Sequence, residues 1–74
     1  MSQNFRKGEL MTLLELKYER GKAKREATGL LDRAVNESRS LTIAEQVRFD
    51  ALAARVSELD NAIAERESLR KLAQ

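Results

Sequence analysis

The sequence predicts an all-α fold, an antiparallel two-helix hairpin or short coiled coil that we expect to self-associate. Its 74 residues are 35% charged, 42% hydrophobic and only 4% aromatic, with no Pro, which is typical of long helices. Apolar residues recur every three or four positions in two stretches that flank one polar turn. A chain this short forms a thin core and has no Cys for disulfides, so association is its remaining source of stability. We expect a flexible leader over 1–10 and the hairpin over 11–74.

The first arm of the hairpin is predicted to be a helix over about 11–37. Its apolar positions recur at spacings of three and four, and Arg20 takes the one place in this register where an apolar residue is missing. The register consists of Leu13, Leu16, Ala23, Ala27, Leu30 and Ala34. Gly21 and Gly29 lie inside this helix, where each costs about 1 kcal/mol relative to Ala. They are tolerated in a weak helix, mark a soft point in it, or allow the backbone of a partner to approach closely.

The second arm is predicted to be a helix over about 42–72, after a turn at 38–41. Thr42 and Glu45 are spaced as a capping box, in which each side chain accepts a hydrogen bond from the backbone N–H of the other. The carboxylate of Glu45 is also favourable near the positive end of the helix dipole. Both features predict that the helix starts at about Ile43.

The second helix has a cleaner apolar register than the first, at spacings of 3, 4, 3 and 4. The register residues are Phe49, Leu52, Val56, Leu59 and Ile63. This spacing is that of an a/d seam of about two heptads. Two helices joined by a short turn run antiparallel, so we expect the seam to pack against the first helix. The residues predicted to face it there are Leu13, Leu16, Ala27, Leu30 and Leu31.

The residue types that carry most enzyme chemistry are missing or badly placed. The chain has no His and no Cys, so the commonest general base, metal ligand and thiol nucleophile are excluded. The Asp and Glu residues alternate with Lys and Arg as on a solvated helix surface. The pair Gly21-Lys22 lacks the flanking residues of a phosphate loop, and nothing resembles a calcium loop. We therefore expect no enzyme activity, cofactor, metal or small-molecule substrate.

One basic cluster is a candidate docking patch. It consists of Lys17, Arg20, Lys22, Lys24 and Arg25. On a helix these residues spread over more than one face, and the three aromatic residues are too scattered to form a platform for bases. A solvated basic face explains the cluster best. The alternatives are salt-sensitive phosphate contacts to nucleic acid and docking on an acidic protein.

Neither a membrane span nor a secretory signal is predicted. No stretch approaches the roughly 20 apolar residues that a spanning helix needs. The apolar patch near the N-terminus is short, is broken by Glu15 and lacks a small-residue cleavage site. We expect a chain that is not secreted, has no membrane partner and lies in the cytoplasm.

The segment 41–52, with the sequence LTIAEQVRFDAL, carries a family resemblance, together with the register residues that follow it. It resembles the N-terminal delta, or scaffolding, segment of tailed-phage major capsid proteins of the Hong Kong 97 type. Many of those segments begin with Met-Thr-Leu and a Leu-rich basic helix. They then cross a turn into Leu-Thr, a nearby Glu and Arg-Phe-Asp-Ala-Leu. Met11-Thr12-Leu13 matches that start, so the resemblance extends to about Leu72.

Three features depart from the family pattern. A ten-residue leader precedes Met11, and the β-rich capsid domain that follows the segment in that family is not part of these 74 residues. The turn carries Ser38 where the family commonly has Gly, the residue that a left-handed backbone favours.

The resemblance implies a role in assembly. In that family the segment lies inside the immature shell, guides coat subunits into capsomers and is later removed by a phage protease, without catalytic residues of its own. The partners implied are other copies of the chain, phage coat subunits, or both, in the cytoplasm of the host cell or the interior of the immature virion. The alternatives are a small basic hairpin that binds nucleic acid, which the scattered charges disfavour, and a generic coiled-coil adaptor.

Overall fold

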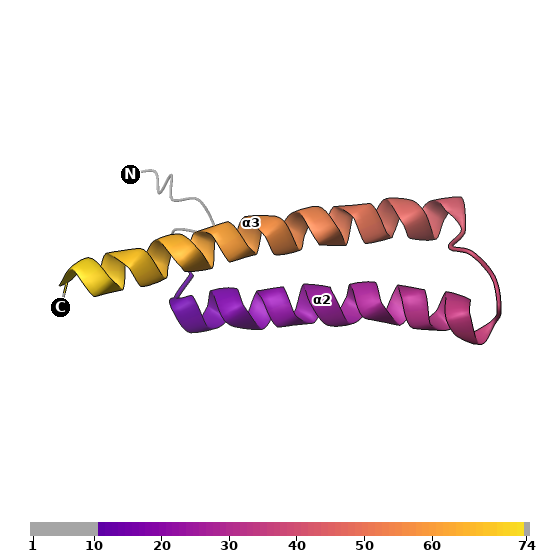
Figure 1. The fold of residues 1–74 in the computed structure, drawn as a ribbon, viewed down its shortest axis with the longest axis horizontal. Helices are drawn as coiled ribbons and strands as arrows, with labels where there is room; N and C mark the ends of the chain where they lie inside the picture. Colours follow the sequence, from indigo (N-terminus) through magenta and orange to yellow (C-terminus); the bar gives the residue numbers. More distant parts are fainter. Residues whose placement is uncertain (1–10, 74) are drawn as a thin grey trace, which may run out of the picture.

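The computed structural model describes residues 11–73, which form two helices joined by one loop (Figure 1). Helix α2 spans Leu13–Asn36 and helix α3 spans Ile43–Ala73, and the two run antiparallel. The prediction of an all-α hairpin is confirmed. The leader predicted over 1–10 and the last residue of the predicted hairpin lie outside the described residues.

The two helices differ in length. At 1.5 Å per residue, the 24 residues of α2 extend about 36 Å and the 31 residues of α3 about 46 Å. The C-terminal end of α3 therefore continues past the start of α2 (Figure 1). The last turns of α3 have no part of α2 beside them.

A capping box starts α2. The N–H of Glu15 donates to Oγ1 of Thr12 at 3.1 Å, and the N–H of Thr12 donates to Oε1 of Glu15 at 2.8 Å. Met11 precedes the cap and packs against the apolar cluster that contains Leu16. These two residues occupy the positions of a hydrophobic staple, which fixes the direction in which the chain enters the helix.

A Schellman motif ends α2. The N–H of Ser38 donates to the carbonyl of Val35 at 3.0 Å, and the N–H of Arg39 donates to the carbonyl of Ala34 at 2.9 Å. This pattern requires a left-handed residue, and Ser38 has a φ of 52°. The left-handed backbone considered from the sequence is therefore present, with a serine in the conformation that favours glycine.

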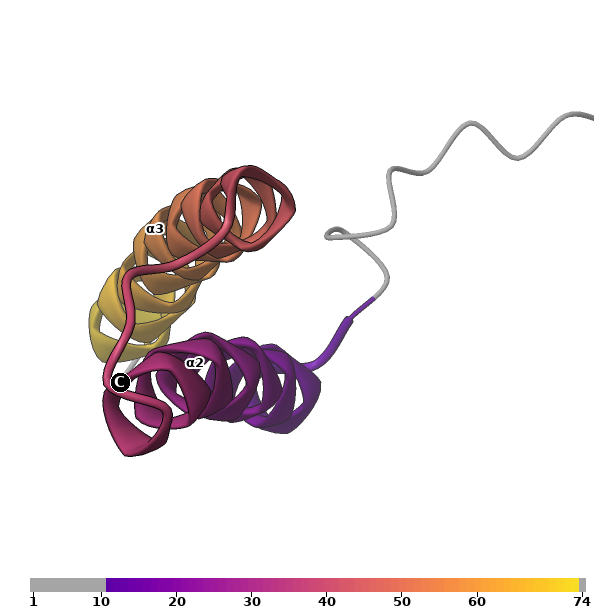
Figure 2. The same ribbon diagram turned by 90° about the vertical axis from the view of Figure 1, so that its right-hand side faces the viewer.

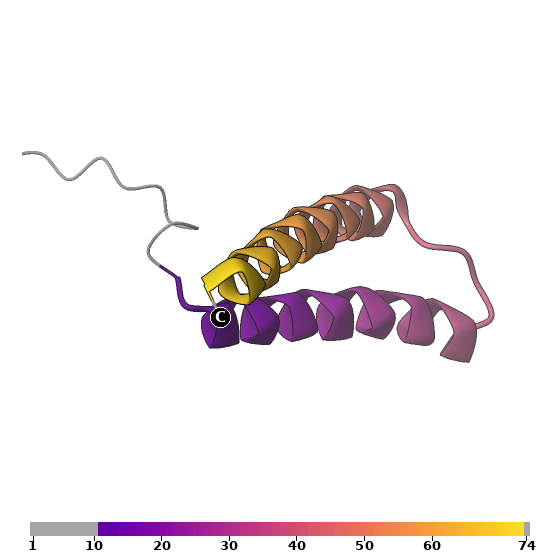
Figure 3. The same cartoon turned by 60° about the vertical axis from the view of Figure 1, so that its left-hand side comes forward.

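Packing between the helices is strongest near the chain ends. Leu16 of α2 forms a buried cluster with Leu59 and Ile63 of α3, and Leu13 packs against this cluster. From there the helices diverge toward the loop, as two views of the hairpin show (Figures 1 and 3). The view along the hairpin from the loop shows that the helices cross at an angle instead of lying parallel (Figure 2).

Helix α2 runs unbroken through both of its glycines. A Cβ atom on Gly29 would meet no other atom within 4 Å, and one on Gly21 would lie 3.3 Å from Nη1 of Arg25 on the same helix. No backbone of α3 approaches either glycine within that distance. Within this hairpin both glycines are tolerated helix residues.

Candidate functional site

The predicted contact seam lies between the two helices, with one exception. Four of its ten residues are buried and five are half-buried. The buried residues are Leu16, Leu52, Leu59 and Ile63, and the half-buried residues are Leu13, Ala27, Leu30, Phe49 and Val56. The seam is therefore used within the hairpin, where it joins α2 to α3.

The exception is Leu31, whose side chain is 43% exposed in the hairpin. Successive helix residues are turned by about 100°, so with Leu30 directed between the helices its neighbour points to the side. Two alanines of α2, Ala23 and Ala34, are buried although they are not among the predicted contacts. They belong to the apolar register recognised in the sequence, and that register is the signal that could have identified them.

The basic cluster does not form one docking patch. Nζ of Lys17 lies 3.2 Å from Oε2 of Glu67, and Nη1 of Arg20 donates to Oδ1 of Asp60 at 3.0 Å. Two of its five residues therefore form ion pairs between α2 and α3. Arg20, which takes the place of a missing apolar residue in the register of α2, contacts α3 through its ion pair with Asp60.

The other three basic residues lie on two sides of α2, because Lys22 and Arg25 are three residues apart and share one side, whereas Lys24 faces the other. Lys22 lines a groove between the helices, whereas Lys24 and Arg25 are exposed. Lys22 and Lys24 are about 160° apart around the helix axis. Lys24 therefore points away from the side of the helix that carries Lys22.

The groove lies on the side of the hairpin opposite the Arg20–Asp60 pair and has a volume of about 330 Å³. It is lined by Glu19, Lys22, Ala23, Glu26, Arg48, Ala51, Leu52 and Arg55. Nε of Arg48 donates to Oε2 of Glu26 at 2.7 Å across it. Small apolar side chains line part of it, and paired charges occupy its rim.

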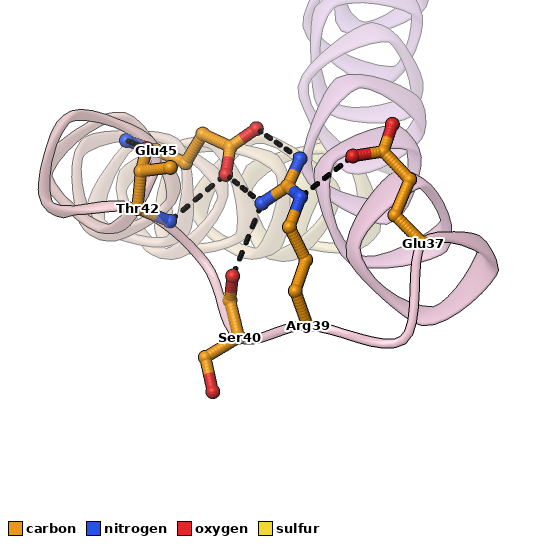
Figure 4. Close-up of polar contacts among 5 residues, drawn as sticks. All are labelled: Glu37, Arg39, Ser40, Thr42 and Glu45. Carbon is orange, nitrogen blue, oxygen red and sulfur yellow. Dashed lines mark hydrogen bonds and ion pairs between the residues drawn. The ribbon is translucent and has the colours of Figure 1, made fainter.

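A polar cluster joins the facing ends of the two helices at the loop (Figure 4). The guanidinium of Arg39 donates to Glu37 at 2.7 Å and to the two oxygens of Glu45 at 2.8 and 3.3 Å. Arg39 also donates to the backbone carbonyl of Ser40 at 3.0 Å. One loop side chain therefore links the C-terminal end of α2 to the N-terminal turn of α3.

The capping box predicted at the start of α3 is present. The N–H of Thr42 donates to Oε1 of Glu45 at 2.9 Å, and the N–H of Glu45 donates to Oγ1 of Thr42 at 3.1 Å. The hydrogen bonds from Arg39 and then from the Thr42 backbone lower the pKa of Glu45 from its ordinary 4.5 to about 2. The hydrogen bond to Glu45, followed by the one to Glu37, raises the pKa of Arg39 above its ordinary value. Sequence reasoning identified the cap but not Arg39.

Large apolar side chains are exposed outside the seam. Across residues 11–73 they are Leu14, Tyr18, Leu31, Val35, Ile43, Val47, Leu69 and Leu72. Four of them lie near the loop and four near the chain ends. Single exposed apolar residues are ordinary, but aligned ones on one helix face mark a contact surface.

Neither chemistry nor known relatives identify an active site. Within the described range, no group of three or more His, Cys, Asp or Glu residues is placed to hold a metal ion. Neither helix of that range is long and apolar enough to span a membrane. Comparisons with protein-family models, curated proteins and solved structures find no match.

Proposed function

We propose that this chain is a non-catalytic assembly module, a helical hairpin that brings the subunits carrying it together through helix–helix contacts. The observation that carries the proposal is the distribution of apolar side chains. The seam predicted from the sequence is occupied within the hairpin, yet eight large apolar residues of the described range stay exposed. Such a hairpin has a contact surface left for a partner after its own fold is satisfied.

The segment 41–52 resembles the delta segment of Hong Kong 97-type coat proteins. This resemblance supports phage coat proteins as the subunits that the module brings together. A module of this kind acts by raising local concentration and fixing orientation through weak, repeated contacts. Weak contacts suit assembly, because subunits that join wrongly can separate again. A small number of exposed apolar residues fits this need better than a large obligate interface.

The arrangement of charges argues against the nucleic-acid alternative. Lys17 and Arg20 form ion pairs with α3, and of the remaining residues Lys22 and Arg25 share one side of α2 while Lys24 faces the other. Binding to a nucleic-acid backbone needs unpaired cations along one face. We therefore assign these residues to the stability of the hairpin.

The proposal is tested by attaching the chain to the N-terminus of a monomeric carrier protein, the position of the delta segment in its family. We expect light scattering to show reversible association that rises with concentration, while the carrier alone stays monomeric. A second fusion with Leu16→Asp removes the hairpin and should behave like the carrier. A wild-type fusion that stays monomeric at all concentrations up to solubility would refute the proposal.

A further inference from the structure

Helix α3 carries a second apolar stripe, which is turned away from the seam. Its members are spaced three or four residues apart along the whole helix, as in a helix contact surface. We call it the outer stripe, and it consists of seven apolar residues and two glutamates: Ala44, Val47, Ala51, Ala54, Glu58, Ala62, Glu65, Leu69 and Leu72. Its centre is turned by about 140° from the seam that packs on α2.

The large residues of the outer stripe are among the most exposed apolar side chains of the hairpin. Val47 is 65% exposed, Leu69 is 58% exposed and Leu72 is 82% exposed. Leu69 and Leu72 lie in the part of α3 that continues past the start of α2 (Figure 1). The two ends of the stripe are therefore uncovered in the hairpin, whereas Ala62 packs against the buried cluster and Ala51 lines the groove.

We propose that a second copy of this chain covers the outer stripe, with the two α3 helices antiparallel and a two-fold axis near Glu58. This inference rests on the proposed function and names the surface through which the module associates. The hairpins would then form a four-helix array, with both α3 helices in the middle and an α2 helix on each outer side. An interface between identical copies must be complementary to itself, and the outer stripe meets this condition in size and in charge.

The size complementarity follows from the register. A two-fold axis at Glu58 places Val47 of one copy opposite Leu69 of the other, and Ala44 opposite Leu72. Large side chains at one end of the stripe thus meet smaller ones from the other end. Near the axis Ala54 lies opposite Ala62, and small residues there allow the two helices to approach closely.

The charges favour the antiparallel arrangement over the parallel one. Arg55 lies 3.9 Å from Glu58 on the same helix, and across the axis it meets Glu58 of the second copy. Two arginines and two glutamates then alternate around the axis. Glu65 falls opposite Ala51 of the second copy, diagonally between its Arg48 and Arg55. Glu58 faces Glu58 in either arrangement, but parallel helices would also oppose Glu65 with Glu65 and Arg55 with Arg55, which is destabilising.

Single cysteines provide the test of orientation, because the chain has no cysteine of its own. Val47→Cys and Leu69→Cys chains of different tag length are mixed and oxidised by dissolved oxygen, and the disulfide products are separated by mass. We expect the mixed product, which links one chain of each variant, to dominate over both self-linked products. A self-linked Val47→Cys chain as the main product would overturn the antiparallel arrangement, and random linkage would overturn the interface. Val35→Cys, with 72% exposure on α2, is the matched control and should form few disulfides.

Association constants of the full chain test the same surface. Val47→Asp should weaken association by at least about tenfold, whereas Val35→Asp should leave it unchanged. Glu58→Arg alone should also weaken association, and adding Arg55→Glu should restore it by exchanging the two charges. All these positions are exposed, so circular dichroism should show unchanged helix content. Association that is unaffected by Val47→Asp overturns the outer stripe and leaves the proposed function standing, whereas a wild-type chain that never associates overturns both.

Discussion

The two halves of the hairpin share one apolar seam, with Ala34 and Leu52 buried in the turn half, but they differ in the further contacts that join the helices. In the chain-end half, Leu16, Leu59 and Ile63 pack into a buried apolar cluster, with Leu13 beside it. In the turn half the helices diverge, and Arg39 connects their ends through charged hydrogen bonds (Figures 3 and 4). The burial of apolar surface provides most of the stability of a small fold, but it does not specify where the chain reverses.

Geometry is specified mainly in the turn half. A Schellman motif, a left-handed Ser38 and the capping box of Thr42 and Glu45 follow one another within a few residues. Each has a defined backbone geometry, and together they set the direction in which α3 leaves the loop. The hairpin thus uses one end for stability and the other for direction, and variants can separate these two contributions.

The largest effect is expected for Leu16→Ala in the chain-end half. Leu16 is fully buried, and truncation of a buried leucine costs about 2–5 kcal/mol, which is a large share of the stability of a small domain. Thermal unfolding followed by circular dichroism should show a large drop in Tm or loss of the folded state. Leu14→Ala, at an exposed position in the same helical turn, is the control and should change the stability little. Equal effects of the two variants would show that the apolar cluster does not hold this half.

The next largest effect is a loss of stability in acid, and it arises from Glu45 in the polar cluster of the turn half. Because the pKa of Glu45 is lower in the folded chain than its ordinary value, protonation favours the unfolded chain. The contribution of this carboxylate is complete above about pH 4.5 and is lost as the pH falls toward 2. Glu45→Gln should be less stable than wild type at neutral pH, and the difference should shrink across this pH range. Denaturant unfolding at several pH values measures this difference, and a constant difference would contradict the prediction.

A smaller effect, in the stabilising direction, is expected for Gly29→Ala. A Cβ atom at this position meets nothing within 4 Å, so the helix propensity of Ala should add about 1 kcal/mol. The midpoint of urea unfolding should rise. Gly21→Ala is the matched variant, and it should gain less because Arg25 must move slightly. A loss of stability at Gly29 would indicate a close neighbour that the hairpin itself does not contain.

The smallest effect is expected for Ser38→Gly in the loop. Glycine adopts the left-handed conformation of this residue without the steric cost of a Cβ atom, so we expect a gain of about 0.5 kcal/mol after the added flexibility of the unfolded chain is subtracted. Ser40→Gly is the control, because only the flexibility of the unfolded chain should change there. Urea unfolding of the two variants side by side measures the difference. A lower stability of Ser38→Gly would show that the side chain of Ser38 has a role beyond its backbone conformation.

The helices and their seam could be predicted because both depend on local sequence. The period of three and four residues identifies the buried face, and the Thr42–Glu45 spacing identifies a helix start. The same signature, Thr12 followed three residues later by Glu15, was present at the start of α2 and could have been used there. Leu31 lies at the side of this face and is 43% exposed, because it is turned by about 100° from Leu30.

The polar contacts between distant residues could not be predicted from the sequence. Lys17 and Glu67 are fifty residues apart, and their pairing depends on the register of two antiparallel helices. Arg39 reaches both Glu37 and Glu45 only because the loop follows one particular path. The basic cluster was interpreted as a surface patch because Glu67 and Asp60, the partners of Lys17 and Arg20, are distant in the sequence.

Sedimentation equilibrium of the unmodified chain over a wide concentration range tests the central claim most directly. The claim is that the hairpin satisfies its own seam and still associates through a second surface. A mass that rises from the 8.4 kDa of the monomer toward twice that value agrees with the account. A mass that stays at 8.4 kDa up to the highest concentration would contradict it.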